Sequence, residues 1–408
     1  MELMQKSNGL PTAKRFTLTW LGEKDWLALL LWFGLSILVA AKELMANNAN
    51  NFSVFRYVYL HLVAQQPLYI PYPENYYDVN MYGPVYSIII APFAVLPFSV
   101  GAMLWVIANA LFLYIAIRKL PITRVQQNLV LIFSSHELMG SSSYFQFNPS
   151  IIACLILSFV LIRQGKDFWA AFFIMIAALV KLYGIVGLAF FFFSKHRWRL
   201  IGSLILWGAV LWILPAVISS FDYIVQSYKE WGDAIVQKNK KNYKFDQGVI
   251  FQNISAMGFI QRVFHLKQLN NLWVLCPAFL LFGTHYLRLK WKENREYCLY
   301  LLCSVLLFTV IFSTSSESPT YIISFPAVCI WYVLQKPTRW NNALFIFVLI
   351  FTSFAHSDLL TPWVRHNVML PYAGKAFPSI VMWLVIVYQI WDKQFLRLPQ
   401  PAGNAAVA

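Results

Sequence analysis

Long apolar blocks separated by short polar connections run along most of the chain. Examples are Trp26–Leu44, Gly101–Ile117, Leu200–Ile218 and Ser379–Trp391. A helix of about 18 or more apolar residues is long enough to cross the hydrocarbon core of a bilayer. The pattern therefore predicts an all-α, polytopic membrane protein with about 12 transmembrane helices, which form a single transmembrane domain over residues 1–408.

The composition supports this class and excludes others. Of the 408 residues, 59% are hydrophobic and 12% are charged, whereas soluble domains have about 25% charged residues. The formal net charge is +15, but the Lys and Arg residues are dispersed between the apolar blocks. We interpret them as topology signals and lipid-headgroup contacts, so membrane lipids are expected partners and nucleic acid is not.

The basic residues also predict an orientation, because short cytoplasmic connections are enriched in Lys and Arg. Placing the basic connections and both tails in the cytoplasm puts the uncharged connections 141–148 and 314–320 outside. Two long segments, 46–82 and 219–270, then face outward as well. The region 83–117 is too long for one helix and holds three prolines, so we expect either one broken helix or a half-helix plus a full helix.

The outer segment 46–82 begins with the pattern of an amphipathic helix. The apolar positions at helical spacing are Phe52, Phe55, Tyr59, Leu62 and Val63. Arg56 lies off that face. Such a helix is expected to lie in the outer interface of the membrane, either as a structural strut or as a wall for a lipid substrate.

The second half of this segment is rich in aromatic residues around two acids, Glu74 and Asp78. The aromatic positions are Tyr69, Tyr72, Tyr76, Tyr77 and Tyr82. Aromatic faces, hydroxyls and a few carboxylates suit a sugar, and a carboxylate here is a candidate base for an acceptor hydroxyl. An interfacial aromatic belt is the ordinary alternative.

Ionisable residues also interrupt the apolar blocks. His136 and Glu137 lie near the outer end of one block, and Lys181 separates two apolar stretches. An ionisable group at membrane depth indicates a functional site by default. Lys181, at an expected outer turn, is a candidate for binding a phosphate, with a snorkelling structural lysine as the alternative. Further polar residues on expected outer turns are Gln146, Asn148 and Glu317.

Some familiar motifs are absent from the sequence. It contains no Gly-rich phosphate loop, no HExxH and no D-x-D pair, so we expect neither a metal nor another cofactor. An outward-facing transferase has no access to cytoplasmic nucleotide sugars. A sugar linked to a lipid phosphate is therefore the donor that fits the expected topology.

Four motifs follow one another in a distinctive order. They are Asn51-Phe52-Ser53-Val54-Phe55, Tyr82-Gly83-Pro84, Phe145-Gln146-Phe147-Asn148-Pro149 and Lys181-Leu182-Tyr183-Gly184, before a basic loop at 195–199. Over roughly residues 50–199, this order resembles glycosyltransferase family 87 of the GT-C superfamily, and most of all its Bacteroidetes-type members. The resemblance implies inverting transfer of a hexose, typically mannose, from a polyprenyl phosphate to a lipid or glycan acceptor. It also implies a site on the outer face of the bacterial inner membrane.

One residue departs from the family pattern. Members of the family carry a catalytic Asp at the position matched here by Asn51. An amide is not a general base. Either the role has moved to Asp78 or Glu74, or this chain does not use that mechanism.

These observations lead to the following assignments. Asp78 is the first candidate for the base and Glu74 the second, and Lys181 and Arg56 are candidates for the donor phosphate. The other expected substrate-binding residues are Asn51, Tyr69, Tyr72, Tyr82, Gln146, Asn148 and Glu317. A non-catalytic lipid or glycan flippase, or a transporter, is the alternative. A transporter would bury charges at mid-bilayer on several helices, whereas the acids here cluster at the outer edge.

Overall fold

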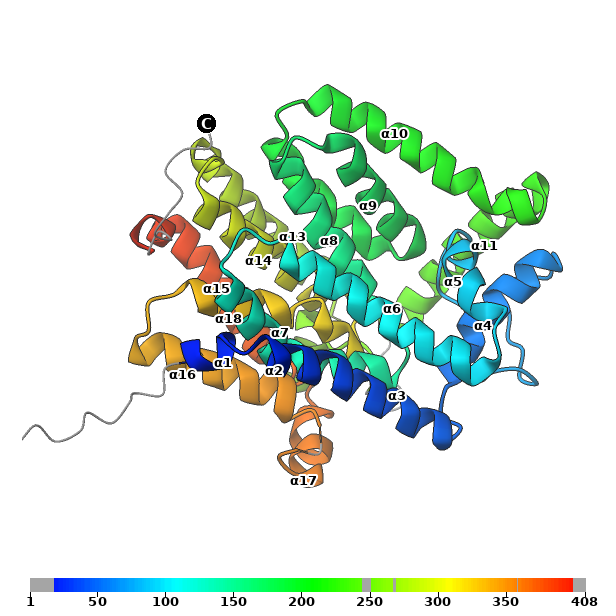
Figure 1. The fold of residues 1–408 in the computed structure, drawn as a ribbon, viewed down its shortest axis with the longest axis horizontal. Helices are drawn as coiled ribbons and strands as arrows, with labels where there is room; N and C mark the ends of the chain where they lie inside the picture. Colours follow the sequence, from blue (N-terminus) through cyan, green and yellow to red (C-terminus); the bar gives the residue numbers. More distant parts are fainter. Residues whose placement is uncertain (1–17, 244–250, 267–268, 358, 399–408) are drawn as a thin grey trace, which may run out of the picture.

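The computed structural model describes residues 18–243, 251–266, 269–357 and 359–398, and its described part is helical with no strand. Figure 1 shows the helices and labels most of α1 to α18. Short 3-10 and π segments are named with η in the text. The first half comprises α1 (Thr19–Gly22), α2 (Asp25–Leu29), η1 (Leu30–Gly34), α3 (Leu35–Met45), α4 (Asn50–Val63), α5 (Tyr86–Ala94), α6 (Phe98–Arg118), α7 (Arg124–Ser143), α8 (Asn148–Arg163), α9 (Asp167–Val180) and η2 (Leu182–Phe193). The second half comprises α10 (Arg197–Ile213), η3 (Leu214–Ile218), α11 (Phe221–Tyr243), α12 (Ala256–Val263), α13 (Leu272–Gly283), η5 (Thr284–Trp291), α14 (Arg295–Ile311), η6 (Ser318–Ile322), α15 (Phe325–Leu334), α16 (Arg339–Val348), η7 (Leu349–Phe354), α17 (Pro362–Val364), η8 (Arg365–Met369), α18 (Ala376–Trp391) and η9 (Gln394–Arg397).

Four helical stretches in the described part are long and apolar enough to cross a membrane. They are Asp25–Met45, Phe98–Arg118, Arg197–Ile218 and Leu272–Trp291. The all-α, membrane-helical character is therefore confirmed, and the larger number of spans expected from the sequence stays a prediction.

The surface of these helices is apolar where a soluble protein would be polar. In α10, Trp198 is 85% exposed and Ile205 is 69% exposed, and in α13 Leu280 is 74% exposed. Figure 1 shows α10 along one edge of the molecule. By contrast, almost every side chain of α8 and α14 is buried. Large exposed apolar faces around a packed interior are what lipid-facing helices require.

The region 83–117 forms a half-helix, α5, followed by the full-length helix α6. Pro97 ends the connection directly before α6, where its fixed φ and missing N–H are tolerated. Gly83 precedes α5 and donates a hydrogen bond from its N–H to the carbonyl of Val180, at 3.0 Å. A Cβ at position 83 would lie 1.9 Å from the carbonyl oxygen of Leu179. Glycine therefore allows the chain after Tyr82 to approach the end of α9, next to Lys181.

Segment 46–82, which is expected to face outward, begins with a helix, α4, but the apolar face of this helix is covered by protein. Phe52, Phe55 and Leu62 are buried, and Phe55 makes edge contacts with the rings of Tyr82 and Tyr86. Val63, the last residue of the helix, is 49% exposed, so the neighbouring helices do not cover the end of this face. The face that the sequence suggested for lipid is used mainly to pack α4 against its neighbours.

The second long segment, 219–270, is also largely helical in its described part. It contains the 23-residue helix α11 and the short helix α12. The indole N–H of Trp231 in α11 donates to the carbonyl of Met81, at 3.0 Å. In Figure 1, α4, α5 and α11 lie together at one end of the bundle, opposite the end that holds α1 and η9. The two long segments are therefore neighbours in space.

Candidate active site

A cavity of about 1210 Å³ lies where the segments expected to face outward come together. Its lining includes residues from 46–82, 141–148, 219–270 and 314–320, together with residues of α7, η7 and the turn before α18. The volume exceeds the range of about 300–1,000 Å³ usual for small-molecule pockets. It is large enough for two substrate groups at once.

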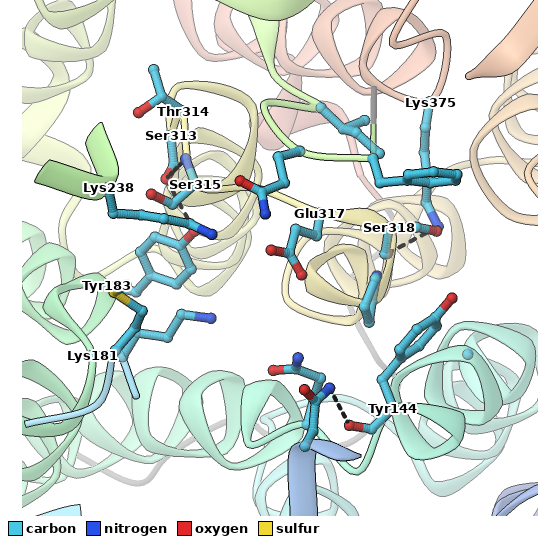
Figure 2. A pocket seen from close by; sticks show the side chains of 18 of the residues that line it. Tyr144, Lys181, Tyr183, Lys238, Ser313, Thr314, Ser315, Glu317, Ser318 and Lys375 are labelled. Carbon is cyan, nitrogen blue, oxygen red and sulfur yellow. Dashed lines mark hydrogen bonds between the residues drawn. The ribbon is translucent and has the colours of Figure 1, made fainter. Parts of the chain in front are cut away.

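One end of the cavity is cationic. Lys181 lies in the break between α9 and η2, and its Nζ donates to the Oδ1 of Asn148 at 2.9 Å. The same Nζ lies 4.8 Å from the ring centroid of Tyr183 and 5.8 Å from that of Tyr82. Lys238 of α11 lines the cavity as well, and Figure 2 shows it beside Tyr183 and Lys181. Neither lysine forms an ion pair with a described carboxylate within 4.0 Å.

A serine-rich turn closes this cationic end. The hydroxyl of Ser313 donates to the hydroxyl oxygen of Tyr183 at 3.0 Å. The hydroxyl of Thr314 donates to the Oδ1 of Asn239 at 2.7 Å, which ties the turn to α11. These bonds hold Lys238 and Lys181 on the same side of the cavity although they are 57 positions apart (238 − 181).

Glu317 projects into the open space between the two lysines of the cationic end and Lys375 on the other side of the cavity (Figure 2). It is the N-cap of η6: the backbone N–H of Thr320 donates to the carbonyl of Glu317 at 3.0 Å, and the backbone N–H of Glu317 donates to the hydroxyl of Thr320 at 3.2 Å. Burial raises the pKa of the Glu317 carboxyl; nearby Lys181 and Lys238 oppose that rise, and Asp78 adds to it. Glu317 therefore lies within electrostatic range of both cations and of the other acid.

Asp78 is an exposed residue of the cavity lining. The backbone N–H of the preceding residue, Tyr77, donates to the Oδ1 of Asn50 at 2.9 Å. Asn51, next along α4, donates from its Nδ2 to the carbonyl of Tyr144 at 2.9 Å and also lines the cavity. The Asn50–Tyr77 bond thus places the carboxylate-bearing turn beside the first turn of α4, where the Asn51 amide lies.

Tyr82 and Gln146 form the wall between these features. The hydroxyl of Tyr82 donates to the Oε1 of Gln146 at 3.0 Å, and both residues line the cavity. The indole of Trp105 donates to the carbonyl of Phe145 at 2.8 Å, so the turn that carries Gln146 and Asn148 is fixed from the protein interior. The wall is aromatic, polar and held in place by buried groups, as a sugar-binding surface requires.

The comparison with known protein families decides the class of this site. The model of glycosyltransferase family 87 matches residues 80–314, which is more than half of the 408-residue chain. The chain belongs to glycosyltransferase family 87. No curated protein matches it. The matched range includes Tyr82, Lys181 and Glu137, and it ends at Thr314, just before Glu317.

Within this family 87 chain, the structure separates the expected site residues into two groups. Those that line the cavity are Asn51, Asp78, Tyr82, Gln146, Lys181 and Glu317, and Asn148 is bound directly to Lys181. Those outside the cavity lining are Arg56, Tyr69, Tyr72 and Glu74.

Local packing accounts for the second group. Tyr69 donates to the carbonyl of Tyr82 at 3.0 Å and so supports the lining from behind. Tyr72 packs on His61 with ring centroids 4.0 Å apart, and its hydroxyl donates to Pro67 at 2.9 Å. Glu74 is exposed.

The partner of Glu137 was not predictable from the sequence. Lys375, just before α18, lies 2.9 Å from Glu137 and both side chains are 3% exposed. Its Nζ also donates to the carbonyl and the hydroxyl of Ser318, at 3.2 and 3.1 Å. Glu137 was recognisable as an acid in an apolar block, but a lysine 238 positions away carries no sequence signal of pairing with it.

Proposed function

We propose that this glycosyltransferase moves a hexose, with mannose the first candidate, from a polyprenyl phosphate to a lipid or glycan acceptor in the 1210 Å³ cavity. The proposal rests on one observation above all: in a chain of family 87, a carboxylate, two lysines without carboxylate partners and a tyrosine wall line the same cavity. In this proposal the chain has about 12 spans in the bacterial inner membrane. Both termini are cytoplasmic, and the cavity faces outward.

Lys181 and Lys238 are the proposed site for the donor phosphate. A phosphodiester carries one negative charge and has oxygens that accept charge-assisted hydrogen bonds. Lys181 donates to a neutral amide, and it packs against the ring faces of Tyr82 and Tyr183. No carboxylate therefore neutralises the Lys181 ammonium by an ion pair, and its charge can act on a bound phosphate. Positive charge here also stabilises the phosphate as it leaves.

The apolar part of the lining suits the polyprenyl chain. Leu275 and Phe279 of α13, Phe308 of α14 and Phe312 directly after α14 line the cavity on this side. The surface of α13 is largely exposed and apolar, as expected for a helix in contact with lipid. A chain with its phosphate at Lys181 would lie along these residues and continue into the bilayer.

Asp78 is the proposed base. In the reaction, the acceptor hydroxyl oxygen attacks C1 of the hexose from the face opposite the phosphate, and a new C–O bond forms. The bond between C1 and the phosphate oxygen breaks, and polyprenyl phosphate leaves with the electron pair. Asp78 takes the proton of the hydroxyl. The bond from Tyr77 to Asn50 supports this role, because it holds Asp78 close to the position at which other family members carry an Asp.

The decisive experiment moves the carboxylate from position 78 to position 51. Radiolabelled polyprenyl-phosphate mannose is supplied to the full-length protein in lipid nanodiscs, and the label that leaves the carrier is counted. Asp78→Asn is expected to lower kcat by about 10²- to 10⁴-fold, the usual contribution of a general base. Adding Asn51→Asp to this variant is expected to restore part of the activity, since it supplies a carboxylate at the neighbouring first turn of α4.

Glu74→Gln is the matched control, because it also neutralises an acid of the same segment but outside the cavity lining. It is expected to leave kcat within about twofold of the parent. Unchanged turnover in Asp78→Asn would contradict the assignment of the base. Loss of turnover in Glu74→Gln alone would move the role to Glu74. Failure of every polyprenyl-phosphate sugar to lose its label would contradict the proposed function itself.

A further inference from the structure

The end of the cavity away from Lys181 holds two histidine rings that the proposed reaction does not use. His136 belongs to α7 and His356 lies in the turn after η7, and both line the cavity. Within the described part of the chain, the Nε2 atom of each ring is buried and has no hydrogen-bond partner. His356 is only 8% exposed. A buried polar atom without a partner is costly, so a ligand that bonds to it recovers free energy.

One hydrogen bond holds the ring of His136. The Ser353 oxygen lies 2.8 Å from the Nδ1 of His136. Whichever nitrogen of the neutral ring carries the proton, Nε2 can accept a hydrogen bond from a hydroxyl group or donate one to its oxygen.

The surrounding charges favour hydroxyl groups over an anion. The Lys375 ammonium makes hydrogen bonds to both Glu137 oxygens, at 3.1 and 2.9 Å, and further bonds to Ser318, so its donors are used. The pair has no net charge. Burial, with Lys375 and Arg365 nearby, lowers the pKa of His356 to about 3, so this ring is neutral at physiological pH. Arg365 also lines the cavity and is able to donate to hydroxyl oxygens.

We propose that His136, positioned by Ser353, and His356 form a hydroxyl-binding subsite for the headgroup of the acceptor, which is therefore a polyol-headed lipid. This inference rests on the proposed function only in calling the ligand the acceptor. Figure 2 shows Lys181 and Lys375 on opposite sides of the open space, so this subsite lies across the cavity from the proposed donor phosphate. Val39, in the candidate span Asp25–Met45, and Met139 also line the cavity and offer an apolar path for an alkyl chain.

The test measures binding without turnover. Octyl mannoside, kept below its micelle concentration, is titrated into the full-length protein in nanodiscs by isothermal calorimetry. His136→Phe keeps an aromatic ring against Phe354 but removes Nε2, and it is expected to raise Kd about 3- to 10-fold, the value of one hydrogen bond. His356→Phe is expected to do the same, and His366→Phe, an exposed residue outside the lining, is the matched control.

A second measurement separates a binding role from a structural one. In ¹⁵N NMR of histidine-labelled protein, the Nε2 signal of His136 is expected to shift when octyl mannoside binds. Ser353→Ala removes the hydrogen bond at Nδ1 and is expected to change the spectrum of the free protein. The donor KM is expected to be the same in all these variants.

Three outcomes would overturn the subsite: no binding of octyl mannoside by the parent protein, equal Kd in the parent and both cavity variants, or displacement by inorganic phosphate. Binding that weakens in His136→Phe while no sugar is transferred would uphold the subsite and contradict the proposed function instead. The two proposals can therefore fail separately.

Discussion

Two lysines reach the cavity from opposite sides, and their surroundings differ. Lys375 is buried against Glu137 at 2.9 Å, with further bonds to Ser318. Lys181 donates to the amide of Asn148 and packs against tyrosine rings, and Glu317 acts on it from a distance. The first lysine is neutralised by its partner, and the second is not. The same residue type thus serves to hold the fold at one end of the cavity and to present charge at the other.

The difference shows how a membrane protein uses an expensive group. A charge taken out of water is tolerated when a partner neutralises it, and removing one partner leaves the other buried and uncompensated. A lysine without a carboxylate partner gains no stabilising ion pair in the folded protein. The desolvation free energy of such a lysine is consistent with a ligand that supplies the negative charge. Variants that remove one lysine at a time test this contrast directly.

Lys375→Met is expected to have the largest effect, and on stability. It leaves Glu137 buried without its partner, which costs about 3–5 kcal/mol. Thermal unfolding of the protein in nanodiscs should show a large drop in the midpoint. The double variant Glu137→Leu with Lys375→Met is expected to recover most of the loss, because no uncompensated charge remains. A double variant as unstable as the single one would contradict the neutral-pair interpretation.

Lys181→Met is expected to have an intermediate effect, and on donor binding. A hydrogen bond to a charged group contributes about 1.5–3 kcal/mol, so the KM for polyprenyl-phosphate mannose should rise at least about 10-fold while the unfolding midpoint stays near that of the parent. Lys229→Met is the matched control, since it removes one charge from exposed α11 surface outside the cavity. Equal donor KM in the parent and in Lys181→Met would remove Lys181 from the site.

The smallest expected effect is a pH dependence of the donor KM that arises from Glu317. Burial and Asp78 raise the pKa of Glu317, against the influence of Lys181 and Lys238. As the pH falls from neutral through this raised pKa, Glu317 takes up a proton and no longer competes with the donor phosphate, which stays charged. The donor KM should therefore fall by a few fold on acidification. Glu317→Gln should have the low KM throughout that range, and a parallel pH profile in this variant would exclude Glu317 as the cause.

Much of the candidate site was predictable because its residues are unusual for their surroundings. Asp78 is an acid within an aromatic segment, Lys181 interrupts an apolar run, and Glu317 lies in a short polar turn. Each is costly or rare at the edge of a membrane, so each is visible without a structure. Periodicity also indicated α4, although it could not reveal that neighbouring helices would cover the apolar face of that helix.

The remaining features depend on contacts between distant parts of the chain. Arg56 was a candidate beside Lys181, and Glu74 was the second candidate after Asp78. Only the packing of segment 46–82 leaves Arg56 and Glu74 outside the cavity lining. The alternative at 83–117 was open because prolines mark a break without fixing which helix is short.

The sequence by itself determined the class of this protein: an all-helical membrane glycosyltransferase whose polar residues gather in the segments expected to face outward. Apolar runs and their interruptions are local properties, so they can be read along the chain. The tertiary structure alone decided which polar residues share one cavity, that Glu137 is neutralised by Lys375, and that the histidine nitrogens at that end have no described partner. These are properties of pairs far apart in sequence, and pairing becomes visible only when the helices are packed.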